Sequence, residues 1–596
     1  MRLVSPTGRL ACRLLAAMLA LSGAAHARGP VQVRLIGIND LHGNLEAANL
    51  TLFLADPGAP PEAPQLRVQV GGAAAIAGMV QKLRAGAPQS FMLAGGDLIG
   101  AAPLVSTLFR HESAIEILND IGLEVSSLGN HEFDAGEAEL RRIIRGGCAA
   151  TAPDDPVASC AQSRYRGARF KYIAANVKDE RGRNIVAPYV IKRFEGIPIA
   201  FIGGVTKTTP QMVIPSGIKG LRFLDEAEAV NRAAKEIRAK GVRAMVAVFH
   251  EGLELGTSQK RGDWNDVTCP DAHGPLLDIA RRLDPEIKVI FSGHTHQGYR
   301  CEIEGRLLIQ GTSYGRGISV VDVELDRGTR AMLPPKRSIN LPVVNEKTDP
   351  AQRERLAASL PQEYAMVVRE AKPDAAIAAK VARFAALVAP KGERAVGRIA
   401  GGFSRGRELG AQAGDSTVDS SAGRLIADAQ LAATRAEGAQ LAFMNPGGIR
   451  SNLECAAPPC TVTFGQVFTM QPFGNSLVVM TLTGEQLKAL LEAQQRSATG
   501  QPTLLQPSEG FTYTWQSDAP RGERVRDMRL LGEPVRADAA YRVTVNSFLA
   551  EGGDGFAILT AGTDRKGGGQ DLDALTAYLA ARERAPVPSP RITRLP

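Results

Sequence analysis

The chain has 596 residues, of which 44% are hydrophobic and 22% are charged, and its formal net charge is +8 at pH 7. This length predicts two or more domains with ample apolar cores. Charges of both signs are interspersed, no basic run has interleaved aromatic residues, and no later apolar run is long enough to cross a membrane, so we expect neither a nucleic-acid partner nor a stable membrane anchor.

The first 27 residues have the order of a secretory signal peptide. Three arginines precede an apolar run from Leu14 to Leu21, and Ala25-His26-Ala27 supplies small residues at a cleavage position. The apolar run is too short to span a bilayer as a helix. A buried N-terminal helix is the alternative, but the basic, apolar, small-residue order favours export. We therefore expect a periplasmic or secreted protein whose mature chain starts near Arg28.

The next part of the chain alternates strands and helices. The apolar runs Val31–Ile38, Ser90–Ala94 and Leu123–Leu128 are typical of buried strands, whereas Ala73–Leu83 and Ser106–Ile121 have a helical pattern. Two more apolar runs, residues 242–249 and 288–292, are expected to be strands. This alternation predicts a layered α/β domain, in which the loops at the strand ends carry the site.

Polar motifs follow these strands, and they contain five of the seven histidines beyond the signal segment. The motifs are Asp40-Leu41-His42, Gly95-Gly96-Asp97, Gly129-Asn130-His131-Glu132-Phe133-Asp134, His250-Glu251-Gly252 and Gly293-His294-Thr295-His296. Unrelated polar loops are the alternative interpretation. The shared position at strand ends favours a single site instead.

The residue types of these motifs favour a pair of metal ions. Alternate residues of a strand face one side, so Asp40 with His42, and His294 with His296, are expected to face a common point. Carboxylate, imidazole and amide groups suit divalent ions such as zinc, manganese or magnesium. A carboxylate shared by two ions, for which Asp97 is the candidate, would hold them about 3.5–4 Å apart.

His131 and Asp134 are candidates for catalysis rather than for metal binding. The imidazole of His131 can act as an acid, a base or a ligand, and Asp134 is close enough in sequence to orient it. Taken alone, a loop histidine with satisfied hydrogen bonds is the more common case. The metal-type motifs around it favour the catalytic interpretation.

Six cysteines lie beyond the signal segment, an even number that suggests disulfides in an oxidising compartment. Fifteen pairings are possible. The simplest pairing joins cysteines of one local segment: Cys148–Cys160, Cys269–Cys301 and Cys455–Cys460.

A helical connector and a second domain complete the chain. Residues 350–387 are rich in Ala, Arg and Glu and are interrupted by Pro361 and Pro373, as in a rigid spacer. In the second domain, Asp419 or Ser420 can cap a helix. Three motifs follow: Asn445-Pro-Gly-Gly-Ile-Arg450, Gln471-Pro-Phe473-Gly-Asn475, and a run from Asn546 to Phe556 that includes Phe548 and Asp554. Two phenylalanines, an arginine for anionic groups and an aspartate for ribose hydroxyls together suit a nucleotide, although phenylalanines beside glycine-rich turns are more often core residues.

The order of the strand-end motifs resembles the calcineurin-like metallophosphoesterases, and the whole chain resembles the two-domain 5′-nucleotidase family. The resemblance implies a signal peptide (1–27), a metallophosphoesterase domain (28–345) that is a layered α/β sandwich, a helical connector (346–393) and an α+β C-terminal domain (394–596). It implies one metal ion held by Asp40, His42, Asp97 and His296, and a second held by Asp97, Asn130, His250 and His294.

The same resemblance implies roles for the second domain. Phe473 and Phe548 would sandwich the base, Asn445 and Asn475 would contact the base or its surroundings, Arg450 would contact the ribose-phosphate region, and Asp554 the ribose hydroxyls. One departure concerns the phosphate-binding arginine that family members often place before the segment equivalent to Asp419. This chain has Gly414-Asp-Ser-Thr-Val there, and Arg405, Arg407 or Arg424 are the candidate substitutes.

The implied activity is hydrolysis of nucleoside 5′-monophosphates, with two divalent ions and His131, oriented by Asp134, at the reacting phosphate. UDP-sugars, nucleoside di- or triphosphates and 2′,3′-cyclic nucleotides are alternative substrates on the same scaffold. A thiosulfohydrolase-like enzyme and a non-catalytic surface-binding protein are more remote alternatives. The sequence leads to no prediction of oligomeric state.

Overall fold

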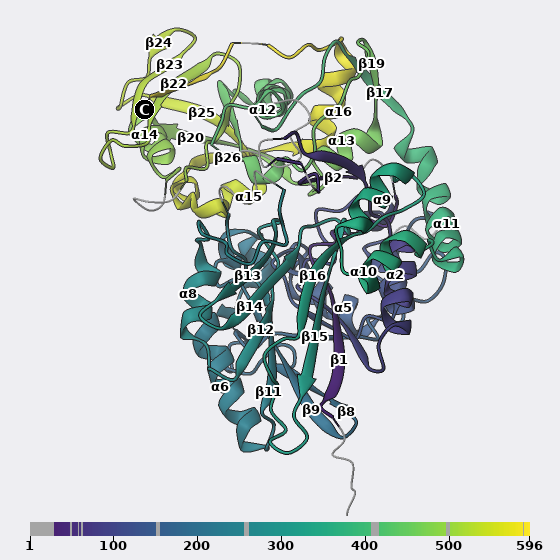
Figure 1. Cartoon of the computed structure of the whole chain (residues 1–596). Helices are drawn as coiled ribbons and strands as arrows, with labels where there is room; N and C mark the ends of the chain where they lie inside the picture. Colours follow the sequence, from purple (N-terminus) through teal and green to yellow (C-terminus); the bar gives the residue numbers. More distant parts are fainter. Residues whose placement is uncertain are drawn as a thin grey trace, which may run out of the picture.

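The computed structural model describes residues 29–595 except 48–49, 58, 61–62, 151–154, 256–261, 407–416, 496–500 and 588. The expected signal peptide lies outside these residues. Figure 1 shows two lobes: the purple-to-teal N-terminal elements and the green helices next to them form one lobe, and the later, light-green-to-yellow elements form the other.

Two six-stranded sheets form the centre of the N-terminal lobe. The first has the order β16 (Arg337–Pro342), β15 (Gly317–Leu325), β1 (Val31–Ile38), β4 (Ser90–Ala94), β5 (Val125–Ser127), β6 (Lys171–Ile173). The second has the order β13 (Gly298–Ile303), β14 (Arg306–Gly311), β12 (Ile287–Phe291), β11 (Ala244–His250), β9 (Ile197–Val205), β8 (Tyr189–Phe194). In each sheet four adjacent strands are parallel, so their carboxyl ends meet at one edge.

The two sheets pack face to face through a layer of buried apolar side chains. Phe91 of β4 stacks on Phe201 of β9, with ring centroids 4.2 Å apart, so the contact bridges the sheets. Helices cover the outer faces: α2 (Ala73–Ala85), α3 (Leu104–Thr107), α4 (Glu112–Ile121) and α5 (Gly136–Arg145) on the first sheet, and α6 (Glu226–Ala239) and α8 (Pro275–Arg282) on the second. The layered α/β sandwich predicted from the sequence is confirmed.

The predicted helix over residues 106–121 is wrong as a single element. It is divided into α3 and α4 because Arg110 and His111 have left-handed backbone conformations, with φ of 51° and 63°. The side chain of Ser106 hydrogen-bonds Nδ1 of His111 at 3.0 Å, which holds the turn between the two helices.

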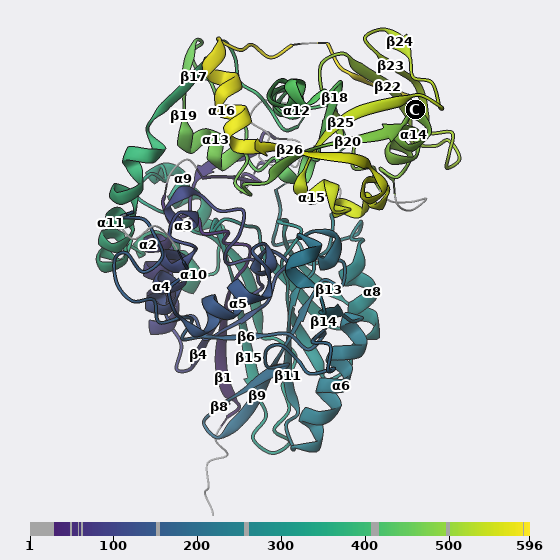
Figure 2. The same cartoon turned by 180° about the vertical axis from the view of Figure 1, so that it is seen from behind.

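The connector consists of α9 (Pro350–Ala358), α10 (Gln362–Glu370) and α11 (Ala375–Gly392), and Figure 2 shows it against the side of the N-terminal lobe. Tyr364, Val368 and Phe384 belong to the apolar core under the first sheet. Arg34 of β1 pairs with Glu363 of α10. The connector is therefore packed against the N-terminal lobe.

The C-terminal lobe is built on a mixed five-stranded sheet with the order β21 (Gln506–Pro507), β18 (Leu441–Met444), β25 (Ala540–Asn546), β20 (Ser476–Thr483), β26 (Thr563–Gln570). A four-stranded sheet has the order β24 (Glu533–Pro534), β23 (Val525–Leu530), β22 (Phe511–Gln516), β27 (Ile592–Leu595), and β17 (Ala395–Ile399) pairs with β19 (Cys460–Thr463). The helices are α12 (Ser421–Thr434), α13 (Phe464–Met470), α14 (Gly484–Glu492), α15 (Ser547–Ala550) and α16 (Asp571–Ala581). Ser420 caps α12 by accepting a hydrogen bond from the backbone N–H of Gly423, so of the two predicted candidates it is the cap.

All three local disulfides form in the structure: Cys148–Cys160, Cys269–Cys301 and Cys455–Cys460. No helix in the described part of the chain combines the length and the apolar character needed to cross a membrane.

Candidate active site

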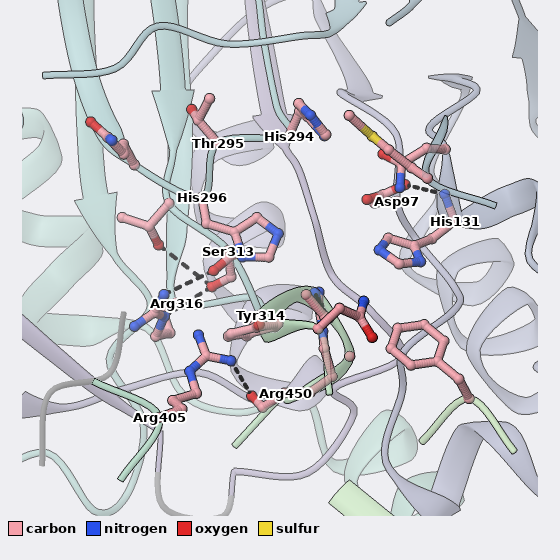
Figure 3. A pocket seen from close by; sticks show the side chains of 18 of the residues that line it. Asp97, His131, His294, Thr295, His296, Ser313, Tyr314, Arg316, Arg405 and Arg450 are labelled. Atoms are coloured by element: carbon pink, nitrogen blue, oxygen red, sulfur yellow. Dashed lines mark hydrogen bonds between the residues drawn. The ribbon is translucent and has the colours of Figure 1, made fainter. Parts of the chain in front are cut away.

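Twelve of the fifteen predicted site residues line a cleft between the two lobes, which has a volume of about 1870 Å³. The other three, Asp40, His42 and His250, are fully buried. Figure 3 shows Asp97, His131, His294 and His296 of the N-terminal lobe on one side, and Arg405 and Arg450 of the C-terminal lobe on the other. The first group lies at the edge where the parallel strands of both sheets end. The topology thus places the strand-end motifs together.

The loops that follow β1 and β4 are joined along their backbones. The N–H groups of Asp40 and His42 donate to the carbonyls of Gly96 and Asp97, at 3.0 and 2.9 Å. Gly96 has φ of 86°, and a Cβ on it would lie 2.7 Å from Nδ1 of His250, so only glycine fits this close approach.

The prediction that strand alternation brings pairs of ligands together is wrong in its geometry. β1 ends at Ile38, and Asp40 and His42 lie in a turn beyond it with φ of 47° and 46°. His294 and His296, with φ of 74° and 58°, also lie beyond their strand. Left-handed turns, which are uncommon for residues other than glycine and concentrate at functional sites, aim these side chains.

His42 and His296 form one half of the cluster. Nδ1 of His42 donates to the carbonyl of Gly100 at 2.9 Å, so Nε2 carries the lone pair. This Nε2 lies 3.1 Å from Nε2 of His296 and 3.6 Å from Oδ2 of Asp97, and Nε2 of His296 lies 3.3 Å from Oδ1 of Asp40. Burial lowers the pKa of both imidazoles, so they are neutral and suited to act as ligands.

His250 forms the other half, with Nδ1 bonded to the carbonyl of Gly95 at 2.8 Å. Its Nε2 lies 3.1 Å from Oδ2 of Asp97 and 3.0 Å from Oδ1 of Asn130. Burial opposes a charge on this ring, but Asp97 raises the pKa of His250 to about 10, and a divalent cation would take the place of that proton. The ring of His294 lies beside it, with centroids 5.1 Å apart, and burial lowers the pKa of His294 to about 3.

These donors fit divalent cations. Among the described residues, three groups have ligand atoms within 4.8 Å of one another: Asp40 with His42 and His296, His42 with Asp97 and His131, and Asp40 with Asp97 and His250. His294 belongs to none of them, although it lines the same cleft. Oδ2 of Asp97 faces both His42 and His250, which is the position that a shared carboxylate requires.

His131 lies at the edge of this cluster and is oriented by Asp134. Its Nδ1 is 2.8 Å from Oδ2 of Asp134, so Nε2 is directed away from that carboxylate. Its backbone N–H donates to Oδ1 of Asp97 at 2.9 Å. Burial opposes a charge on the imidazole, but Asp134 and then Asp97 raise the pKa of His131. The ring can therefore supply a proton or a positive charge beside the cations.

Glu132 is a buried residue of this motif that the sequence reasoning left out. Its carboxylate accepts hydrogen bonds from the backbone N–H groups of Gly129, Asp97 and Leu98, at 2.6, 3.0 and 2.9 Å. It thereby ties the loop after β5 to the loop that carries Asp97. The glutamate stands in the Gly-Asn-His-Glu motif, and this position was the available signal.

The six predicted substrate contacts all line the C-terminal wall of the cleft: Asn445, Arg450, Phe473, Asn475, Phe548 and Asp554. Phe473 stacks on the imidazole of His131, and the guanidinium of Arg450 lies 5.8 Å from the Phe473 ring centroid. Asn445 donates a hydrogen bond from Nδ2 to Oδ2 of Asp554 at 2.8 Å. The amide of Asn445 is thus engaged with Asp554.

Among the three candidate substitutes for the phosphate-binding arginine, Arg405 lines the cleft. One of its terminal nitrogens donates to the carbonyls of Ile449 and Arg450. Arg424 pairs with Asp419 at the start of α12 instead, and Arg407 lies outside the described residues.

Arg316 is a further arginine of the cleft that the sequence reasoning missed. It belongs to the loop after β14, and its guanidinium lies 5.4 Å from the ring centroid of Tyr314, which in turn contacts His296 edge to face. Its position after a strand end was the available signal.

The comparisons with known proteins agree with this geometry. Residues 33–298 match the family model of calcineurin-like phosphoesterases, and residues 396–561 match the model of the 5′-nucleotidase C-terminal domain. The chain is 32% identical to Endonuclease YhcR of Bacillus subtilis over 92% of its own length, and 30% identical to Cell wall protein Lmo0130 of Listeria monocytogenes over 89%. It spans 40% and 65% of the lengths of these two relatives. The crystal structure of a 5′-nucleotidase precursor from Thermus thermophilus superposes with a TM-score of 0.72 at 26% identity, over 95% of this chain and 99% of the other.

Proposed function

Since this chain belongs to the 5′-nucleotidase family and has an N-terminal calcineurin-like phosphoesterase domain, we propose that it is an exported dinuclear-metal phosphoesterase that hydrolyses nucleoside 5′-monophosphates to nucleoside and phosphate. The observation that carries the proposal is the position of Oδ2 of Asp97 between the Nε2 atoms of His42 and His250. We retain the predicted domain limits, with the metal ligands before residue 346 and the substrate contacts after residue 393.

In this proposal one cation is held by Asp40, His42, Asp97 and His296, and the other by Asp97, Asn130, His250 and His294. Bound divalent ions would supply Lewis acidity and an activated water for in-line attack on phosphorus.

The residues of the chain supply the remaining chemistry. His131, with Nδ1 held by Asp134, directs Nε2 toward the reacting phosphate, where it stabilises the developing charge or protonates the leaving 5′-oxygen. Glu132 keeps the loop of Asp97 and the loop of His131 in one arrangement. Binding energy from the nucleoside then positions phosphorus at this centre.

The C-terminal wall supplies nucleoside recognition in this proposal. Phe473 and Phe548 stack on the base, at about 1–3 kcal/mol for each contact. Arg450 contacts the ribose-phosphate region, Asp554 accepts hydrogen bonds from the ribose hydroxyls, and Asn475 lies near the base. Asn445 lies at the same wall, with its amide directed to Asp554.

A second candidate activity is hydrolysis of substrates with a longer phosphate part, such as nucleoside di- or triphosphates or UDP-sugars. Arg316 and Arg405 favour it, because they add positive charge to the cleft next to Tyr314, beyond the metal ligands. The name of the YhcR relative keeps phosphodiesters, including 2′,3′-cyclic nucleotides, among the alternatives. A thiosulfohydrolase-like enzyme would have no use for the pair Phe473 and Phe548. A purely binding protein would have no use for a full set of metal ligands.

Product analysis tests the proposal. The purified protein, loaded with zinc or with manganese, is incubated with AMP, ADP, ATP, UDP-glucose and 2′,3′-cyclic AMP, and nucleoside and phosphate are quantified. We expect release of phosphate and adenosine from AMP with the highest kcat/KM, and loss of this activity with a chelator. Preference for another substrate would replace 5′-monophosphates in the proposal, and absence of hydrolysis on the whole panel would overturn it.

A further inference from the structure

Three side chains at the C-terminal wall form a continuous hydrogen-bonded series, here called the amide relay: Asn546, Asn445 and Asp554. Nδ2 of Asn546 donates to Oδ1 of Asn445 at 2.9 Å, and Nδ2 of Asn445 donates to Oδ2 of Asp554 at 2.8 Å. Asn546 and Asn445 are 1% and 2% exposed, so bulk water does not compete for these bonds.

The direction of the relay is determined at both of its ends. At one end, Oδ1 of Asn546 accepts the backbone N–H of Leu549 at 2.9 Å and caps α15, so its Nδ2 must face Asn445. At the other end, the carboxylate of Asp554 can only accept. Asn445 must therefore present its oxygen to Asn546 and its amide hydrogen to Asp554, and the other amide orientation would place oxygen against oxygen at Asp554.

The amide relay ends at Asp554, whose backbone conformation is strained. Asp554 has φ of 52° and ψ of 21° within Gly552-Gly553-Asp554-Gly555, a left-handed conformation that is costly for a residue with a Cβ. Gly553 packs against the ring of Phe548, and a Cβ on it would lie 2.5 Å from that ring. The position of the carboxylate is thus coupled to the aromatic wall on one side and to Asn445 on the other.

We propose that Asn546 is a positioning residue for ribose selectivity: by orienting Asn445 it holds the Asp554 carboxylate where both hydroxyls of a ribose can donate to it, so that ribonucleotides are preferred to 2′-deoxyribonucleotides. This inference rests on the proposed function. The cis-diol donates two hydrogen bonds to a carboxylate, and a 2′-deoxyribose donates one. Loss of a hydrogen bond to a charged group corresponds to about ten- to hundred-fold in kcat/KM.

The substitution that isolates the relay is Asn546→Asp. An aspartate has the same shape and still caps α15 through one carboxylate oxygen, but it cannot donate to Asn445. Asn445 then either loses this bond or turns its amide toward the introduced carboxylate, which places its own oxygen against Asp554. Asn546→Ser serves if the first variant does not fold, because serine retains a capping oxygen and is too short to reach Asn445.

The experiment measures kcat and KM for AMP and for dAMP, together with the rate on a phosphate ester that has no base or sugar. For wild type we expect a ratio of kcat/KM for AMP over dAMP of about ten or more. In Asn546→Asp this ratio should fall toward one, mainly through a higher KM for AMP, while the base-free ester reports on the intact metal centre. Asn546→Asp combined with Asp554→Asn should recover thermal stability, because the relay is complete in the reverse direction, but should not recover the ratio.

Two results would overturn the inference while leaving the proposed function in place: a wild-type ratio near one, or an unchanged ratio in a folded Asn546 variant. If wild type hydrolysed no nucleotide, the proposed function would fail and this inference with it.

Discussion

The ring of Phe473 lies nearly parallel to the imidazole of His131, with 5.7 Å between their centroids and 20° between their planes. The two residues come from different lobes. One belongs to the turn before β20, and the other to the loop after β5. A residue expected only to stack on a base therefore also covers the residue expected to assist the chemistry.

This contact separates the predicted effects of the two phenylalanines. Phe548→Ala should lower kcat/KM for a nucleotide by about 1–3 kcal/mol or more and have little effect on a base-free phosphate ester, because base stacking and the packing against Gly553 beside Asp554 both serve the nucleoside. Phe473→Ala should slow both substrates, because it also uncovers His131. With both replaced, the loss for the nucleotide should reach about 2–6 kcal/mol if the stacking energies add. Steady-state kinetics on AMP and on the ester measure these effects, and equal losses on both substrates for Phe548→Ala would mean that this ring is a core residue.

The sequence predicts which segments are strands and which residues belong to the site better than it predicts the orientation of the side chains in the site. The ranges Val31–Ile38 and Ser90–Ala94 agree with β1 and β4, because each is an apolar run bounded by polar or glycine residues. Asp97 follows β4 of the first sheet and His250 ends β11 of the second, so the packing of the two sheets brings them together. The left-handed turns at Asp40 and His42 could not be predicted, because neither position holds a glycine, the residue type that usually signals a positive φ.

Contacts between segments far apart in the chain could not be predicted from the sequence either. Glu132 acts through three backbone N–H groups, and a backbone donor has no signature in the amino-acid pattern. The stack of Phe473 on His131 depends on how the two lobes meet. Arg316 was missed because an isolated arginine in a loop is usually a solvated surface residue.

A second prediction concerns the metal content of Asp97→Ala. Oδ2 of Asp97 faces both His42 and His250, so its loss should remove most activity and most bound metal, whereas loss of a ligand to one cation should cost less. The protein should remain folded, because the side chain lies at the edge of the sheets. Metal analysis measures the bound metal, and circular dichroism measures whether the protein stays folded. The matched control is Asp120→Ala, at an exposed ion pair of α4. Near wild-type turnover in Asp97→Ala would contradict the shared-ligand assignment.

A third prediction concerns the pH dependence of His131. Asp134 contributes to the raised pKa of this imidazole, and the proposed role uses its protonated form. The rate should therefore fall as pH rises through that pKa, and in Asp134→Asn this alkaline decline should move to lower pH, because the carboxylate that favours the charge is gone.

The measurement for this third prediction is the pH profile of kcat on the base-free ester. His131→Ala should lower kcat by about 10²–10⁴ with nearly unchanged metal content. An alkaline decline that stays in place in Asp134→Asn would show that another group is responsible for it.

The last prediction concerns Glu132. Its carboxylate contacts the expected metal ligand Asp97 only at the backbone N–H group. Glu132→Gln keeps the size of the side chain but replaces one accepting oxygen by an NH₂ group that must face buried N–H donors. At 3% exposure no water can relieve this conflict, so we expect a loss of about 1–3 kcal/mol in the free energy of unfolding. The loop of Asp97 should also loosen, which should weaken metal binding by about 10–100-fold.

Chemical denaturation measures the loss of stability, and metal titration measures the loss of affinity. The control is Glu228→Gln on the exposed face of α6, whose free energy of unfolding should stay within about 0.5 kcal/mol of wild type. If Glu132→Gln lost stability but bound metal with unchanged affinity, the carboxylate would support the fold of these loops without determining the position of Asp97.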